Sequence, residues 1–281
     1  MGRRHDPKPV DSGETCIRMT VSDTTEGQIC GGAVGTCRLV RRVVLRIIDT
    51  TFDFRTDTPQ GRDPDSASPT LRRYHQLLWS KPLPSGVLFQ LDATTPGYYL
   101  LHRSTLGRFE LSSDAVMASY TSYVTMAPII AQFNEDEHAK FNTLGYTIGG
   151  MMVFPGNRVD GKMTINGARG FLRRVADRMD LTLESIRRHY SGEPSPLSAT
   201  LARYADFFAL FDDFRGYVDF FLLQDLVTAD GATVRFFMPF DDFNSPAKPQ
   251  DAETYRKFRQ LSIEFIEARN RRIDALVNQA H

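Results

Sequence analysis

The chain has 281 residues, and its 34 Lys and Arg balance its 34 Asp and Glu. This balance excludes the strongly basic class of nucleic-acid-binding proteins, so any contact with an acidic partner depends on a local patch. Hydrophobic residues make up 41% of the chain and include 20 Phe and 10 Tyr, which is enough for one large, aromatic-rich core.

The sequence has no feature of a membrane protein or of a disulfide framework. No apolar run approaches the length of a membrane-spanning helix, and the N-terminus lacks the apolar segment of a signal peptide. We therefore expect a cytoplasmic protein without membrane contact. The cysteines, Cys16, Cys30 and Cys37, form no CxxC pair and have no His cluster beside them, which argues against disulfides and against a zinc site.

Residues 1–42 differ from the rest of the chain in composition. They are rich in Gly, Ser, Thr, Asp and Arg and have neither helical nor strand periodicity, which is typical of a disordered tail. A start codon assigned too far upstream would produce the same kind of segment. Residues 43–281 are predicted to form a single domain whose first strand is residues 43–48.

The first half of this domain is predicted to contain short strands and one clear helix. Ser68 precedes a proline and predicts a capped helix start, and apolar residues at helical spacing continue to Trp79. A strand is expected at residues 87–92 and a hairpin at residues 98–111. Asp114 is expected to cap the helix that follows.

Acidic side chains before Ser68 raise the question of a metal site. Asp57, Asp63 and Asp65 carry the oxygen ligands that a hard cation prefers. Their spacing is not that of a calcium-binding loop, and arginines alternate with them, so mutual ion pairs and a turn are the preferred interpretation. His138 lies among acids, where a solvated surface histidine is preferred over a metal ligand. We predict no metal site.

Residues 146–190 combine a strand, a polar loop and a patterned helix. Residues 147–154 are apolar and β-branched, and Pro155 follows them, which predicts a buried strand. Thr164 is placed to cap the helix after the loop. The buried side of that helix is indicated by apolar residues at three- and four-residue spacing, namely Ile165, Ala168, Leu172, Val175, Ala176 and Met179.

Polar side chains in this loop and on the flank of this helix predict an anion site. The start of a helix exposes unpaired N–H groups and the positive end of its dipole, and both favour a phosphate or carboxylate. A second interpretation is that Arg173 is merely solvated, while Arg169 pairs with Asp177 or Asp160. The predicted phosphate-binding residues are Arg158, Lys162, Thr164, Asn166, Arg169 and Arg173.

The same loop partly matches the phosphate-binding P-loop. Gly156, Gly161 and Lys162 reproduce the G-x-x-x-x-G-K spacing between a strand and a helix. Met163 then stands where the motif needs a Ser or Thr hydroxyl for magnesium, and no run of parallel strands follows. A nucleotide-hydrolysing P-loop is therefore not expected.

The C-terminal part is predicted to be mainly helical. Asp180 is expected to cap a helix that exposes Arg187, Arg188 and His189, and a largely apolar helix is expected at residues 217–227.

One more strand and a long last helix complete the predicted fold. The strand is expected at residues 233–237, and the helix, with one apolar stripe, runs from about residue 251 to the end. These elements give an α+β domain in which a small, mostly antiparallel sheet packs against a helical C-terminal half.

Four runs of the sequence are similar to a known family. They are DPDSASPTLRRYHQLLWSKPLP (63–84), GKMTINGARG (161–170), DRMDLTLESIRRHYSGEPSPL (177–197) and DFRGYVDFFLLQDLV (213–227). The family that they resemble consists of uncharacterised bacterial and phage proteins grouped as a domain of unknown function. The resemblance covers the chain from about residue 48 onward and implies a single recurring domain with a link to phage or mobile elements. It implies no activity, cofactor or catalytic residue.

Two functional hypotheses of different classes follow. In the first, the predicted site binds phosphates of nucleic acid or a nucleotide, and its cations stabilise charge in a metal-free phosphodiester cleavage with His75 or His102 as acid or base. In the second, the protein is not an enzyme and forms homo-oligomers or other complexes through its aromatic surface or its C-terminal helix. No residue pattern identifies a cofactor.

Overall fold

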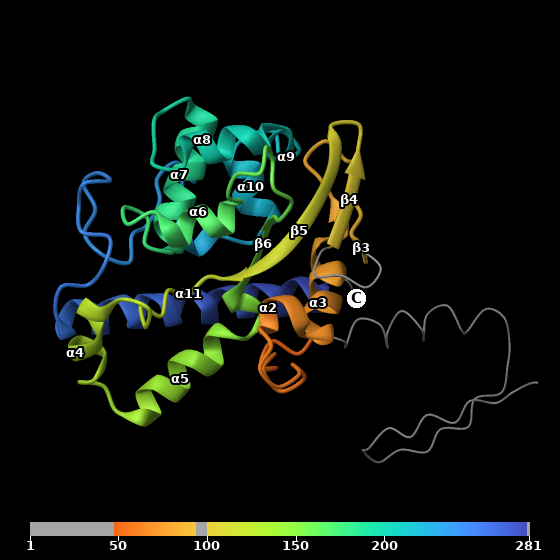
Figure 1. Ribbon diagram of the computed structural model, residues 1–281. Coiled ribbons are helices and arrows are strands. Elements are labelled where there is room, and N and C mark those ends of the chain that lie inside the picture. The colour runs from red at the N-terminus through yellow and green to blue at the C-terminus, as the bar shows by residue number, and fades with distance from the viewer. Residues whose placement is uncertain (1–47, 94–99, 280–281) are drawn as a thin grey trace, which may run out of the picture. The chain divides into compact units, whose positions relative to one another are not determined.

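An antiparallel sheet of four strands, in the order β3-β4-β5-β6, forms the framework of the fold (Figure 1). The computed structural model describes residues 48–93 and 100–279, all of which belong to one compact unit. The predicted tail (1–42), with its three cysteines, and the predicted strand at 43–48, apart from Ile48, lie outside the described residues. The sheet and the helices around it confirm the predicted α+β class.

The hairpin predicted from the sequence is the centre of this sheet. In the hairpin, Ser104 lies opposite Gly107 across a tight turn. The second strand of the hairpin also pairs antiparallel with the last strand of the sheet, so Ala115 lies opposite Met151. The strands are β3 (Asp92–Ala93), β4 (Leu100–Ser104), β5 (Gly107–Ala115) and β6 (Met151–Pro155).

A second sheet contains only β1 (Lys81–Pro82) and β2 (Leu88–Phe89). The single strand predicted for residues 87–92 is therefore divided between two sheets. The strand is interrupted at Leu91, because Leu91 N donates to the side chain of Ser80, at 3.0 Å from Oγ, and not to a neighbouring strand.

Asp114 lies within β5 and caps no helix, so the helix predicted to follow it is wrong. It is opposite Met152 of β6, and Val116 N extends the pairing with a 2.8 Å hydrogen bond to Gly150 O. The strand pairing outweighs the local capping preference of the aspartate. Helical structure resumes only with η1 (Val124–Met126) and α4 (Ala127–Ile130).

The helices before and after β4 and β5 begin at side-chain caps. Ser68 caps α3 (Pro69–Trp79) as predicted, because its Oγ accepts from Leu71 N at 3.0 Å. The charged segment around His138 forms α5 (Glu135–Gly145), which starts with a capping box. A short helix, α2 (Pro64–Ala67), precedes α3.

The C-terminal half is helical, although its elements are shorter than predicted. The helix predicted for residues 217–227 is divided in two, and Leu222 at the break has a φ of 56°, which no helix accommodates. The strand predicted for residues 233–237 is wrong, because only the isolated bridge between Val227 and Val234 forms there. The elements are α6 (Ile165–Phe171), α7 (Met179–Ser191), α8 (Ser198–Leu201), η3 (Ala202–Tyr204), α9 (Ala205–Ala209), α10 (Phe214–Phe220) and η4 (Gln224–Leu226).

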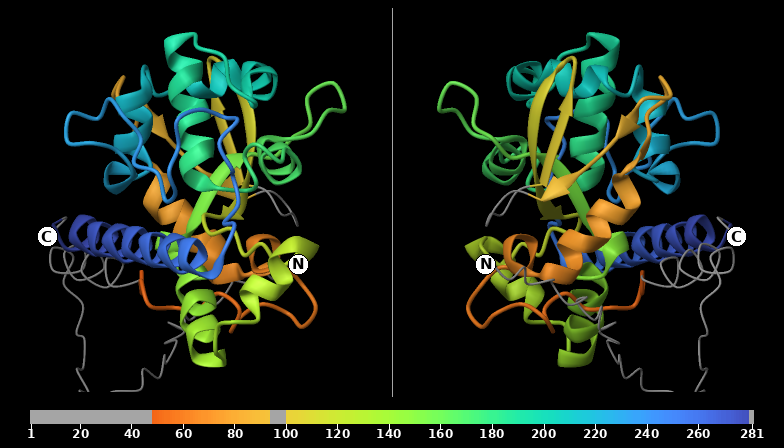
Figure 2. Two further views of the ribbon diagram at one scale, coloured as in Figure 1. Left: turned by 90° about the vertical axis from the view of Figure 1, so that its left-hand side faces the viewer. Right: turned by 90° about the vertical axis from the view of Figure 1, so that its right-hand side faces the viewer.

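The long C-terminal helix is present as predicted. This helix, α11 (Ala252–Gln279), contacts α5, which lies below it in the views of Figure 1 and Figure 2. Its fully buried Arg269 donates to the carbonyl oxygens of Gly149, Met151 and Phe221 at 3.0, 2.6 and 3.0 Å, which fixes the helix against the sheet. None of the described helices has the length and apolar character needed to cross a membrane.

Alanine substitutions at two glycines should change the free energy of unfolding in opposite directions. Gly150 ends η2 (Ile148–Gly150), where an added Cβ would lie 2.2 Å from the carbonyl oxygen of Gly145. Gly167 lies in α6, where a Cβ would meet nothing closer than 3.6 Å. We expect Gly150→Ala to lower the free energy of unfolding by about 1–3 kcal/mol, because the backbone must move. Gly167→Ala should raise it by about 0.5–1 kcal/mol, because alanine favours the helix. Urea unfolding measures both, and effects of the same sign would contradict this packing.

Candidate functional site

Arg169, on α6, is fully buried and engages every nitrogen of its guanidinium. Nη1 donates to Asp114 Oδ2 at 2.6 Å and to Ala115 O at 3.1 Å, and Nη2 donates to Asp177 O at 2.8 Å. Nε donates to Thr182 Oγ1 at 3.2 Å and lies 3.4 Å from Asp177 Oδ1. Although burial disfavours its charge, the carboxylates of Asp177 and Asp114 raise the pKa of Arg169. The interpretation in which Arg169 pairs with Asp177 is therefore confirmed.

The turn after α6 brings Asp177 back to Arg169. The helix predicted to reach Met179 ends at Phe171, and Ala176 and Asp177 adopt positive φ angles of 48° and 62°. Such left-handed conformations are unfavourable for residues with a Cβ, and they cluster at functional sites. Asp177 N donates to Arg169 O at 2.9 Å, so both the backbone and the side chain of Arg169 hold this turn. The Asp177 side chain stays 41% exposed and is accessible to a ligand.

Asp65, in α2, brings a third carboxyl group to the same guanidinium. Its Oδ1 is buried and has no hydrogen-bond partner among the described residues. Burial and the nearby charge of Asp114 raise the pKa of Asp65 to about 8. Burial also raises the pKa of Asp114 to about 6, although Arg169 opposes that shift. At neutral pH Asp65 is therefore protonated while Asp114 is mostly ionised. We call Asp65, Asp114, Arg169 and Asp177 the Arg169 cluster.

The Arg169 cluster has an excess of negative charge. One guanidinium faces three carboxyl groups, two of which form ion pairs with it, at 2.6 Å for Asp114 and 3.4 Å for Asp177. An incoming phosphate would meet carboxylates and no free donor of Arg169, so like-charge repulsion disfavours it. In the part of the chain that the structure describes, no three His, Cys, Asp or Glu side chains are grouped so that they could hold a metal ion.

Burial and the charge of Asp177 raise the pKa of the Tyr123 hydroxyl, and the charge of Arg173 opposes the shift.

The sequence profile of DUF6994, described as a family of unknown function, matches residues 48–273. The chain belongs to DUF6994. The match confirms the resemblance to an uncharacterised domain family, and the matched range includes every residue of the Arg169 cluster. No curated protein and no solved structure gives a significant match to this DUF6994 chain.

Both predicted catalytic histidines lie in the core of this DUF6994 chain. His75 Nδ1 accepts from Trp79 Nε1 at 3.0 Å, and His75 Nε2 lies 2.9 Å from Ser113 Oγ. Burial lowers the pKa of His75 to about 3, so the ring is neutral at physiological pH. His102 stacks on Phe89 with 4.0 Å between ring centroids, and burial lowers its pKa as well. Neither ring hydrogen-bonds to the Arg169 cluster within the described residues.

The six predicted phosphate-binding residues divide between the interior and the surface of this DUF6994 chain. Arg169 is fully buried, as described above. Asn166 Nδ2 donates to Ser112 Oγ at 3.1 Å and to Ser113 O at 3.2 Å, so it also faces β5. The guanidinium of Arg169 and the Nδ2 atom of Asn166 are therefore occupied by contacts within the protein, whereas Asn166 Oδ1 is buried and has no hydrogen-bond partner among the described residues.

Of the other four residues, Arg158, Lys162 and Thr164 lie in the loop before α6, and Arg173 lies in the segment after it. Thr164 caps α6 as predicted, by accepting from Gly167 N at 3.2 Å. Every strand pairing among the described residues is antiparallel, whereas a P-loop lies in a parallel sheet.

The exposed cations among the predicted phosphate-binding residues are Arg158, Lys162 and Arg173. Phosphate binding therefore stays a prediction, and these three cations are the part of the set that remains open to a ligand.

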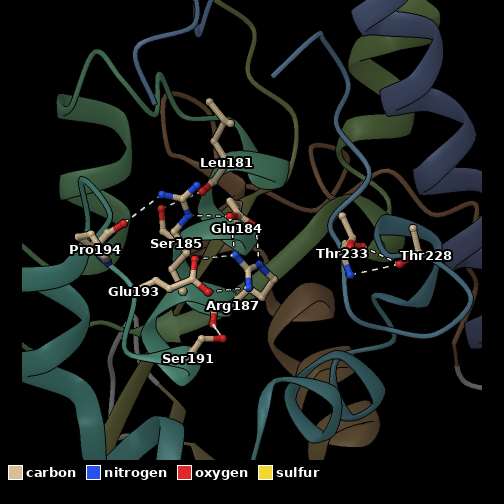
Figure 3. Close-up of polar contacts among 10 residues, drawn as sticks. Leu181, Glu184, Ser185, Arg187, Ser191, Glu193, Pro194, Thr228 and Thr233 are labelled. Carbon is tan, nitrogen blue, oxygen red and sulfur yellow. Dashed lines mark hydrogen bonds and ion pairs between the residues drawn. The ribbon is translucent and has the colours of Figure 1, made fainter. Parts of the chain in front are cut away.

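The two arginines of α7, Arg187 and Arg188, form ion pairs with nearby glutamates (Figure 3). Arg187 points toward Glu184 and Glu193, with Nε 2.8 Å from Glu184 Oε2 and Nη1 3.1 Å from Glu193 Oε1. Arg188 Nε lies 2.7 Å from Glu184 Oε1. The expected exposure of Arg187, Arg188 and His189 is wrong, because all three are half-buried.

Two members of the Arg169 cluster are missed by reasoning from the sequence. The pattern assigns Asp65 to a loop of mutual ion pairs and Asp114 to a helix cap. The strand position of Asp114 could have been predicted from the sequence. Phe109 and Leu111 alternate with polar residues, which is typical of a half-buried strand, and this strand extends to Asp114. No comparable local signal exists for Asp65, because its partners in this DUF6994 chain are distant in sequence.

Proposed function

We propose that this protein is a hydrolase that uses the Arg169 cluster for acid–base catalysis on an uncharged polar substrate. The observation that supports this proposal is the buried, unpartnered carboxyl oxygen of Asp65 in a cluster where Asp114 and Asp177 form ion pairs with one buried guanidinium, together with the raised pKa of Asp65. A carboxylic acid that keeps its proton close to a carboxylate held in an ion pair is the usual basis of paired acid and base roles.

Each member of the cluster has a distinct role in this proposal. Asp65 is the general acid, because it keeps its proton at neutral pH. Asp177 is the general base, because it is the 41% exposed carboxylate and can reach a water molecule. Arg169 is a positioning residue: it holds Asp114 through a hydrogen bond and an ion pair, and it holds Asp177 through the backbone carbonyl and an ion pair.

The charge of the cluster selects the class of substrate. Three carboxyl groups around one cation disfavour an anionic substrate and accept a neutral one. Hydrolysis of a glycosidic bond requires a carboxylic acid that protonates the leaving oxygen and a carboxylate that activates water or attacks the sugar. A glycoside is therefore the substrate class that fits this set of groups best.

The proposal predicts the behaviour of two single substitutions. A panel of aryl glycosides is assayed from about pH 4 to about pH 9 with the full chain. Asp65→Asn and Asp177→Asn should each reduce the rate by about 100-fold or more, because each removes one proton-transfer group. The wild-type rate should fall above about pH 8, where Asp65 loses its proton. Asp206→Asn, an exposed aspartate of α9, is the matched control and should keep the wild-type rate.

The same assay includes an aryl phosphodiester. Cleavage of the phosphodiester that Arg173→Ala weakens and Asp65→Asn leaves unchanged would contradict the acid–base proposal. That result would instead support the phosphate-binding prediction for the exposed cations. Turnover of no glycoside in the panel would reject the proposed substrate class.

A further inference from the structure

Two neighbouring cavities lie along the groove between α5 and α11. The smaller has a volume of about 330 Å³ and the larger of about 550 Å³. Lys140 of α5 and Glu267 of α11 line both of them, and no residue of the Arg169 cluster lines either. Each volume lies within the range of small-molecule sites in proteins.

Arg259 lines the smaller cavity and has an unusual environment. Its side chain is 4% exposed, and its Nη2 donates to the backbone oxygen of Glu137. Its Nη1 is buried and has no hydrogen-bond partner among the described residues. Aromatic rings surround the guanidinium, with centroids 4.9 Å away for Phe133, 4.6 Å for Phe141 and 5.6 Å for Tyr255. An unpaired buried cation is costly, and burial accordingly lowers the pKa of Arg259.

The other buried arginines of the described residues show how this protein normally satisfies a guanidinium. Arg169 pairs with Asp114 and Asp177, and Arg178 pairs with Asp180. Arg269 has no carboxylate, but its three nitrogens all donate to acceptors, chiefly backbone carbonyls. Arg259 has neither a carboxylate partner nor a full set of acceptors. Among the described residues, Arg259 therefore lacks the acceptor that the other buried arginines have.

The charged residues that line the smaller cavity limit the kind of ligand that could supply an acceptor to Arg259. A polyanion would meet acidic side chains, and a simple cation would meet basic ones, whereas a ligand with one charge of each sign complements both. The basic residues are Lys140, Arg256 and Arg259, and the acidic residues are Glu137, Glu264 and Glu267.

We propose that the groove between α5 and α11 binds a zwitterionic, amino-acid-like ligand, with its carboxylate on Arg259 and its ammonium group facing Glu267. A carboxylate accepts hydrogen bonds from a guanidinium, and a change of the Arg259 rotamer that exposes Nη1 to the cavity would give this nitrogen its acceptor. The ligand's side chain extends past Lys140 into the larger cavity. Four threonines are among the residues that line that cavity, namely Thr50, Thr51, Thr143 and Thr147.

Calorimetric titration of the full chain with each standard amino acid tests this inference. At least one amino acid is expected to bind. Its amide, which lacks the carboxylate, and its N-acetyl derivative, which lacks the ammonium group, should each bind about tenfold more weakly or worse. Arg259→Gln should weaken binding by a similar factor. Arg256→Gln, on the exposed side of the same cavity, repeats the test with a variant that keeps the buried Arg259 in place.

Two control variants separate this site from the rest of the protein. Arg215→Gln changes an arginine of α10 whose side chain is 73% exposed, and it should bind like the wild type. Asp65→Asn should also bind like the wild type, so the groove and the Arg169 cluster are tested independently. Failure of every amino acid to bind would overturn the inference, as would a bound amino acid whose affinity neither Arg259→Gln nor Arg256→Gln changes.

Discussion

Replacement of Arg169 by leucine is expected to lower the free energy of unfolding by about 3–5 kcal/mol. The substitution removes the hydrogen bonds to Asp114, Ala115, Asp177 and Thr182. It leaves the 21% exposed Asp114 without its counter-ion, and an uncompensated buried charge is the costly part of breaking such a pair. Chemical unfolding in urea at neutral pH, followed by circular dichroism, measures the difference.

Arg173→Leu is the matched control for this prediction. Arg173 is an exposed arginine of the segment that follows α6, and its loss should change the free energy of unfolding by no more than about 0.5 kcal/mol. Equal effects of the two substitutions would show that the Arg169 cluster does not hold the turn after α6.

Replacement of Asp65 by asparagine is expected to stabilise the protein by about 2–4 kcal/mol near pH 8 and to change little near pH 4. The pKa of Asp65 is raised in the folded state, so the folded protein holds a proton that the unfolded chain has already released. The stability that Asp65 provides is therefore complete below its unfolded pKa and is lost as the pH rises toward about 8. Asparagine cannot ionise, so the variant avoids this loss.

Unfolding curves of the wild type and Asp65→Asn at several pH values test this prediction, with Asp206→Asn as the control. The difference between the wild type and Asp65→Asn should grow as the pH rises, whereas Asp206→Asn should show no such trend. A difference that is independent of pH would contradict a raised pKa at Asp65. A gain in stability together with a loss of activity would be the expected mark of a functional residue kept at a cost to the fold.

The parts of the fold that the sequence predicts correctly are those with local signals. Ser68 caps α3 with its own hydroxyl, Thr164 does the same for α6, and α11 has one long apolar stripe. The incorrect parts depend on distant contacts. Asp114 is extended because β6 pairs with it, and α6 ends early because Arg169 holds the Asp177 turn.

In the candidate site, too, contacts between residues close in sequence could be predicted and contacts between distant residues could not. Arg169 and Asp177 are close in sequence, so their pairing can be inferred from spacing alone. Asp65 and Asp114 reach Arg169 only through the placement of α2 beside β5. Burial and Asp114 raise the pKa of Asp65, and burial and Asp177 raise the pKa of Asp114. None of these causes is visible in the residue types.

The most direct test of acid–base chemistry at the Arg169 cluster is a titration of the Asp65 carboxyl group in the folded protein. Carbon NMR of aspartate labelled at the carboxyl position measures it, and the signal is assigned by its absence in Asp65→Asn. We predict a midpoint near pH 8, with Asp65 protonated at neutral pH. A midpoint at the ordinary aspartate value of about 4 would contradict the account, because Asp65 would then have no proton to donate at neutral pH.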